Sequence, residues 1–313
     1  MIRLVTIGFA FLLLLLTLTI FPHFTIQGDM GLCVSSPNLW TMPRFPGWLL
    51  NTGLILLSVL ILNQANKKYI FVHEIEPVVT MVMTVILVCN CLTTATISAS
   101  TILLFINAIA LFILFSTFED FNATRQFFVI GTFAAIGSMF QYAFLFMVPV
   151  YIGGGLLMKS FRIRELIAFV FGLIAPYWIV FGFGWVSFSD FHWPGIKMVH
   201  NSPPAVREHL LTLISMAILA ITAFIIAVYN SIRLFSRNSR LRCMHLTINL
   251  MGFISGLALL FDFSNFTAYF GTVAFWFAVQ ITSLFPLYRL KQPQEAALLV
   301  ALIISLPLYF IEL

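Results

Sequence analysis

The chain has 313 residues, of which 61% are hydrophobic and only 9% are charged. Soluble globular domains carry about 25% charged residues, so the composition excludes a soluble fold. The formal net charge of +5 does not indicate a nucleic-acid partner, because the basic residues form short clusters between apolar runs. We therefore expect an all-α, polytopic transmembrane helical bundle in which residues 1–313 form a single integral membrane domain.

Apolar runs long enough for a transmembrane helix recur along the whole chain. The first run resembles a signal sequence, but no small-x-small cleavage site follows it, so we interpret it as an uncleaved span. The next segment, from His23 to Phe45, is too polar and broken to cross and should be an outside loop. The eleven predicted spans lie at about 4–22, 47–64, 78–94, 97–117, 127–141, 143–158, 166–185, 209–230, 245–261, 266–288 and 294–311.

Three long apolar stretches are divided only by small or polar clusters, and each division predicts a tight helical hairpin. The pair within 127–158 leaves about 16 residues for each helix, fewer than the roughly 20 that a perpendicular span needs. Half-penetrating or broken helices are an alternative there, and the count would then be nine spans. The three turns are expected at Thr93–Thr96, near Gln141–Tyr142 and at 262–265.

The distribution of Lys and Arg supports eleven spans with a cytoplasmic N-terminus, because positive residues favour the cytoplasmic side. This topology leaves only Arg44, Lys197 and Arg207 outside. One miscounted hairpin would move every later loop to the other side and destroy the asymmetry. The thirteen basic residues predicted on the cytoplasmic side are Arg3, Lys67, Lys68, Arg125, Lys159, Arg162, Arg164, Arg233, Arg237, Arg240, Arg242, Arg289 and Lys291.

Asp262 lies inside a long apolar stretch, and a carboxylate at membrane depth marks a functional site by default. The predicted topology instead places Asp262 in a hairpin turn at the outer surface, where an ionised Asp is ordinary turn chemistry. That structural interpretation is favoured here. If Asp262 were buried, the functional interpretation would be favoured instead.

Amide side chains within the spans allow two interpretations. Asn90, Asn107 and Gln141 could converge on a polar cavity, beside a helix broken at Gly153–Gly155, as in a transporter. More often, such amides tie helices together, at about 1 kcal/mol or less each, and we favour that structural interpretation. The three glycines likewise fit either a local break or close helix packing.

Three acidic residues in outside loops are the catalytic candidates. Asp29 lies in the first loop, where multi-span lipid-linked glycosyltransferases place a catalytic acid, although its Gly-rich surroundings are equally typical of a turn. Asp190 and Glu208 lie in the long loop 187–208. The histidines near this loop match no ligand spacing, and the four cysteines match neither a zinc nor a redox motif, so we predict no metal and no cofactor.

Four arginines within ten residues form a cluster that is predicted to lie on the cytoplasmic side. Anionic lipid headgroups would attract such a cluster at about 1 kcal/mol per arginine, and a phosphorylated ligand could use it. The positive-inside role of these arginines in orienting the protein in the membrane would by itself explain why the cluster is present. These candidate binding residues are Arg233, Arg237, Arg240 and Arg242, with Asp262 as a further candidate.

A short motif indicates a lineage. Phe161–Glu165 enters a span that continues through Gly172 to Ala175–Tyr177, which makes a pattern of Arg-Glu, then Gly, then Pro-Tyr. This pattern resembles a signature of an uncharacterised family of multi-span Bacteroidota proteins, a domain of unknown function, over about 127–290. The resemblance implies a bacterial inner membrane and no mechanism. Further residues that resemble the family are Gly131, Gly137, Pro149 and Tyr229–Asn230.

Three functions are compatible with these features. The first is a role in envelope glycan or lipid-linked sugar metabolism, with membrane lipids and a polyprenyl-linked glycan as partners. The alternatives are a transporter or channel for a small solute and a non-catalytic scaffold that binds other envelope proteins. A hydrophilic cavity open to the bilayer would favour the enzyme, a midplane cavity the transporter, and a filled core the scaffold.

Overall fold

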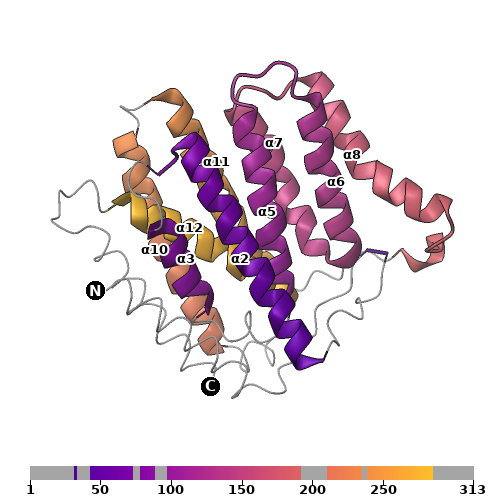
Figure 1. Cartoon of the computed structure of the whole chain (residues 1–313), viewed down its shortest axis with the longest axis horizontal. Helices are drawn as coiled ribbons and strands as arrows, with labels where there is room; N and C mark the ends of the chain where they lie inside the picture. Colours follow the sequence, from indigo (N-terminus) through magenta and orange to yellow (C-terminus); the bar gives the residue numbers. More distant parts are fainter. Residues whose placement is uncertain are drawn as a thin grey trace.

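The computed structural model of the protein describes residues 32–33, 43–72, 78–88, 97–191, 210–234 and 238–284 (Figure 1). These residues are largely helical and include no β-strand, which confirms the predicted all-α class for this part of the chain. Three short 3₁₀ helices are η2 (Tyr142–Met147), η3 (Phe188–Asp190) and η5 (Phe263–Tyr269). The α-helices are α2 (Arg44–Tyr69), α3 (Val78–Val88), α5 (Ala99–Ser116), α6 (Thr124–Phe140), α7 (Val148–Leu157), α8 (Ile163–Gly182), α10 (Leu210–Leu234), α11 (Ser239–Phe261) and α12 (Phe270–Leu284).

The helices follow the apolar runs of the sequence. Nine of the predicted runs fall on α-helices, and the runs at 4–22 and 294–311 lie outside the described residues. By length and composition, α2, α5, α8, α10 and α11 could cross a membrane. The 26 residues of α2 extend about 39 Å, against a hydrocarbon thickness of about 30 Å. The structure thus supports a membrane protein, while eleven spans and the orientation stay predictions.

Two of the three predicted hairpins are present. The chain leaves α-helical geometry at Gln141 (φ −153°, ψ 113°) and again at Asp262 (φ −120°, ψ 68°). After each break a 3₁₀ helix leads into an α-helix that runs antiparallel to the one before. Ser255 thus contacts Thr272, and Asn249 contacts Gln280. The third predicted turn, Thr93–Thr96, lies outside the described residues.

Helix α12 forms the centre of the bundle. Every residue from Phe270 to Thr282 is buried, and α12 contacts α3, α5, α10 and α11. Because no face of α12 reaches the surface, any polar side chain on it needs a partner inside the protein.

Of the two interpretations of Gly153–Gly155, close helix packing is confirmed and a broken helix is wrong. These residues lie in the continuous helix α7, and the reason for the glycines is close packing. A Cβ atom on Gly154 would lie 2.6 Å from Leu114 Cδ2, and one on Gly155 would lie 2.7 Å from the Phe127 ring. The glycines therefore let α5 and α6 approach α7.

The start of α8 carries the Arg-Glu part of the family-like motif. Glu165 is only 1% exposed, and its carboxylate accepts the Arg162 backbone N–H (3.2 Å) and the Thr124 hydroxyl (3.4 Å). The guanidinium of Arg162 lies 4.1 Å from the Phe121 ring centroid. An acidic residue in the first turn compensates the helix dipole. Helix α8 then continues through Pro176 to Gly182.

The backbones of α6 and α8 approach each other closely at two glycines. Gly172 belongs to the family-like motif, and Gly131 is one of the further residues that resemble the family. A Cβ atom on Gly172 would lie 2.2 Å from the Phe128 carbonyl oxygen, and one on Gly131 would lie 2.4 Å from the Phe169 carbonyl oxygen. Small residues at a helix crossing permit this distance in membranes. Since both obstacles are backbone atoms, no side-chain rotation can relieve a substitution.

We expect Gly172→Ala to destabilise the protein by about 1–3 kcal/mol, the usual cost of overpacking, despite the better helix propensity of Ala. The measurement is the thermal midpoint of the purified full chain in detergent. Gly182→Ala is the matched control in the same helix, because a Cβ atom there has nothing within 4 Å. Equal midpoints for the two variants would contradict the crossing as described.

Candidate functional site

Those basic residues predicted to share one side that fall within the described part of the chain lie at one end of the bundle, here called the basic end (Figure 1). Helix α2 finishes there with Lys67 and Lys68, whereas Arg44 begins α2 at the other end. The other described members are Arg125, Lys159, Arg162, Arg164, Arg233, Arg240 and Arg242. Outside the described residues lie Arg3, Arg237, Arg289, Lys291, Lys197 and Arg207.

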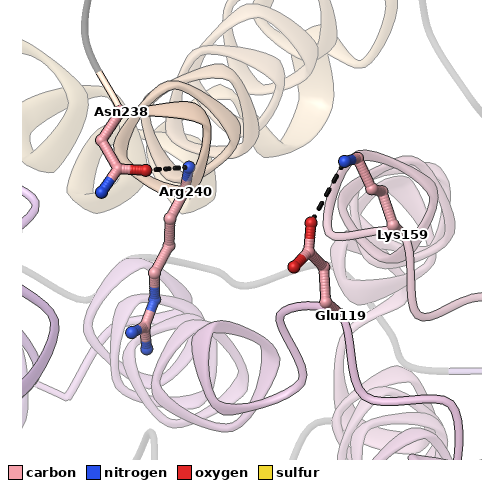
Figure 2. A network of polar contacts seen from close by, with 4 residues as sticks. All are labelled: Glu119, Lys159, Asn238 and Arg240. Atoms are coloured by element: carbon pink, nitrogen blue, oxygen red, sulfur yellow. Dashed lines mark hydrogen bonds and ion pairs between the residues drawn. The ribbon is translucent and has the colours of Figure 1, made fainter.

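Polar and aromatic contacts join the elements that meet at the basic end (Figure 2). The Asn238 side chain accepts the Arg240 backbone N–H (3.3 Å) and so caps α11. The Arg240 guanidinium lies 5.5 Å from the Tyr69 ring and 5.8 Å from the Phe118 ring. Lys159 and Glu119 form an exposed ion pair at 3.1 Å, of a kind that contributes about 1 kcal/mol or less.

The predicted arginine cluster is described in part. Arg233 lies 5.0 Å from the Tyr229 ring, and Arg240 lies over two other rings. Arg242 is half-buried, and Arg237 lies outside the described residues. Contacts with the protein's own rings account for the positions of Arg233 and Arg240, so phosphate binding at this cluster stays a prediction.

Of the three catalytic candidates, the structure describes Asp190. It ends η3 and is exposed, and its Oδ2 atom accepts the Ser187 backbone N–H at 3.2 Å. The nearby aromatic residues Trp185 and Phe188 are 72% and 79% exposed, as expected where a protein meets the membrane interface. Asp29 and Glu208 lie outside the described residues.

Asp262 is fully buried, with 0% exposure, which corrects the prediction of a surface turn. The turn is where the sequence predicts it, but two tyrosines cover the carboxylate. Tyr142 donates to Oδ1 at 2.6 Å from η2, and Tyr269 donates to Oδ2 at 2.8 Å from η5. The two breaks in helical geometry therefore meet at one carboxylate, through residues 120 positions apart.

Further polar contacts follow along the interface of α11 and α12. The Thr272 hydroxyl is 2.8 Å from the Ser255 hydroxyl, and both side chains are fully buried. One helical turn further, Trp276 lies flat against Gly252, where a Cβ atom would be 1.9 Å from the indole ring. This close contact allows the indole N–H to donate to the Asn249 side-chain oxygen at 3.1 Å.

Three amides and a hydroxyl complete this line toward the basic end. Gln280 donates to the Asn249 oxygen (2.6 Å), and Asn230 donates to the Gln280 oxygen (3.0 Å). Asn249 in turn donates to the Ser231 hydroxyl at 3.1 Å. Helices α10, α11 and α12 are thus joined by hydrogen bonds between buried and half-buried side chains. The Asn230 side-chain oxygen is buried without a hydrogen-bond partner.

We call this line the polar seam. Its residues on α12 and at the end of η5, at positions 269, 272, 276 and 280, follow the spacing i, i+3, i+7 and i+11 and so occupy one helix face. This spacing is visible in the sequence alone and could have identified the seam. The seam consists of Tyr142, Asp262, Tyr269, Ser255, Thr272, Asn249, Trp276, Gln280, Asn230 and Ser231.

The three amides that could either line a cavity or tie helices together have separate surroundings. Asn107 on α5 accepts a hydrogen bond from the hydroxyl of Tyr151 on α7 at 2.5 Å. Gln141 is buried at the first break in helical geometry, and Asn90 lies outside the described residues. A shared site for these three amides therefore gains no support.

The described residues include no group of three or more His, Cys, Asp or Glu placed to hold a metal ion. Cys33 and Cys243 are buried free thiols, as expected of small core residues, and burial raises the pKa of the Cys33 thiol. Cys89 and Cys91 lie outside the described residues. The chemistry available at the seam is therefore that of one carboxylate, hydroxyls and amides.

Asn249→Ala should destabilise the protein by about 2 kcal/mol or more, because it leaves the N–H groups of Trp276 and Gln280 without their acceptor. The thermal midpoint in detergent, followed by tryptophan fluorescence, measures this. Asn122→Ala is the control, because Asn122 is exposed at the basic end. An unchanged midpoint for Asn249→Ala would show that the hydrogen bonds from Trp276 and Gln280 to Asn249 contribute nothing to stability.

Comparisons with known proteins add no assignment. No model of a protein family, no curated protein and no solved structure matches the chain. The resemblance to the Bacteroidota family stays a prediction for that reason. Function must be argued from the basic end, the polar seam and the surface around Asp190.

Proposed function

We propose that the protein is a multi-pass inner-membrane transporter for a small solute, and that a proton coupled to transport binds at Asp262. One observation carries this proposal: a fully buried carboxylate lies where two helical hairpins both leave α-helical geometry. Intramembrane carboxylates are costly and serve mainly as ion or proton sites. Interrupted helices are the usual framework of such sites in transporters.

The position of Asp262 along the membrane normal is near one end of the bundle rather than at its middle, so a coupled ion would reach the carboxylate from that side. Helix α11 has 23 residues, so Asp262 lies about 34 Å along the helix from the basic end. The proposed topology has eleven spans and a cytoplasmic N-terminus, which puts the basic end in the cytoplasm and Asp262 near the outer surface. The polar seam then leads from Asp262 toward the cytoplasm between α11 and α12.

A purely structural seam is the competing explanation. Interhelical hydrogen bonds in membranes contribute about 0.6 kcal/mol each on average, and a scaffold protein could use them only to hold its helices. A scaffold, however, needs only hydrogen bonds at position 262, and a neutral amide can also hydrogen-bond to the two tyrosines. The two explanations therefore differ in what Asp262→Asn should do.

Asp262→Asn should abolish proton movement while leaving the fold intact. The full chain is reconstituted into liposomes that contain a pH-sensitive dye, and a potassium gradient with valinomycin imposes a membrane potential. We expect wild-type vesicles to change internal pH and Asp262→Asn vesicles not to, because the amide cannot carry the charge. Tyr269→Phe removes one donor but keeps the carboxylate, and it should reduce the rate without abolishing it.

Asp120→Asn is the matched control for this measurement. Asp120 lies at the basic end, where its carboxylate accepts only the nearby Asn122 backbone N–H at 2.9 Å among the hydrogen bonds described. It should behave as wild type. The proposal fails if Asp262→Asn vesicles change their internal pH as wild-type vesicles do. It also fails if wild-type vesicles show no change of internal pH.

A role in envelope glycan or lipid-linked sugar metabolism is the second proposal, and the position of Asp190 favours it. This exposed carboxylate lies beside the strongly exposed Trp185 and Phe188. The polar part of a lipid-linked sugar would lie at that depth of the interface. Asp190 could then act as an acid or base on such a headgroup.

Asp190→Asn should alter the surface glycans of cells in which the variant replaces the wild-type protein at the same protein level. Profiling those glycans against wild type measures the effect. Asp120→Asn again serves as the control, since its carboxylate also accepts a backbone N–H but lies at the basic end. Unchanged glycans in Asp190→Asn would remove the evidence for this function without affecting the role of Asp262.

A further inference from the structure

A groove lies at the end of α8 that is remote from the basic end. Its volume is about 890 Å³, and its walls come from α6, η2, the second half of α8 and η3, with Leu32 and Phe191. Stacked rings form one wall, because Phe181 lies 4.5 Å from Phe188 and 6.4 Å from Tyr177 between ring centroids. The groove shares neither a lining residue nor a described hydrogen bond with Asp262.

The groove presents an apolar surface to whatever fills it. Its side-chain hydroxyls are those of Ser138 and Tyr177, and these bond to each other at 2.6 Å. A bound water needs two to four polar partners, and two hydroxyls that already satisfy each other are poor partners. The occupant that fits is therefore a hydrocarbon rather than a polar solute.

The groove is continuous with the exposed, apolar face of α8, which would contact lipid where α8 crosses the proposed membrane. Ile174 and Trp178 both line it, and they are 50% and 77% exposed on that face. An opening of this size loses dispersion contacts if it stays empty, and in a bilayer the neighbouring apolar material is lipid. The volume also falls within the range of specific small-molecule sites, about 300–1,000 Å³.

We infer that the groove between α6 and α8 is a binding site for the acyl chain of a membrane lipid. The Ser138–Tyr177 pair closes its inner wall, and the exposed ring of Trp178 marks the side from which the chain enters. This inference does not depend on either proposed function. It would hold equally for a transporter, an enzyme or a scaffold.

Photolabelling in nanodiscs tests the inference. The full chain is reconstituted with phosphatidylcholine that carries a diazirine at the end of one acyl chain, irradiated, digested and mapped by mass spectrometry. We expect adducts on α8 residues 173–182 to exceed those on the exposed face of α10 several-fold. Equal labelling of α8 and α10 would overturn the inference, because it would show only general contact with lipid.

Two glycine variants make the test specific. Gly182 lines the groove, whereas Gly53 lies on α2, and a Cβ atom on either has nothing within 4 Å. Gly182→Leu should fold and reduce the groove adducts several-fold, whereas Gly53→Leu should leave them unchanged. If Gly182→Leu leaves the groove adducts unchanged, the acyl chain of the lipid does not bind in the groove.

A second measurement covers the case in which Gly182→Leu fails to fold. Benzoylphenylalanine at position 174 of the otherwise wild-type chain reports directly on the occupant. A cross-link to lipid supports the inference. A cross-link to residues 192–209 of the same chain overturns it, because the protein's own segment would then fill the groove.

Discussion

The structure depends on one constraint: polar groups that enter a bilayer must be satisfied inside the protein. Asp262 is the most demanding case, since an ionisable side chain is fully buried at the end of α11. Its two oxygens receive hydroxyls from η2 and η5, which belong to different hairpins. The carboxylate therefore fixes the position of both hairpins relative to each other, and the seam follows from the antiparallel pairing of α11 with the wholly buried α12.

Small residues make this arrangement possible. Polar side chains can bond across a helix interface only where the backbones come close, and glycine provides the space. Gly252 faces the Trp276 ring, which places the indole N–H on Asn249. Gly271 approaches α5 so closely that its backbone N–H donates to the Ser100 hydroxyl at 2.7 Å. Substitutions at such glycines would thus break hydrogen bonds as well as packing.

The sequence predicts the positions of the helices well, because the bilayer demands apolar runs of known length. It also predicts both described hairpin breaks and the grouping of basic residues at one end. It does not predict the burial of Asp262, because hydropathy shows which residues can enter the membrane but not what covers them. Tyr142, 120 positions away, supplies that cover. The sequence left open whether Gly153–Gly155 breaks a helix or packs closely against its neighbours, because a glycine run is compatible with both.

Tyr142 links the two regions to which function is assigned. Its hydroxyl donates to Asp262, while the residue belongs to a small apolar cluster with Leu32 and Met139, against which Tyr177 and Phe181 of the groove wall pack. Residues that share a packing partner do not contribute independently to stability or activity. The effects of a groove variant and of Asp262→Asn are therefore not expected to add, because Tyr142 contacts both regions. Their coupling must be measured in the double variant.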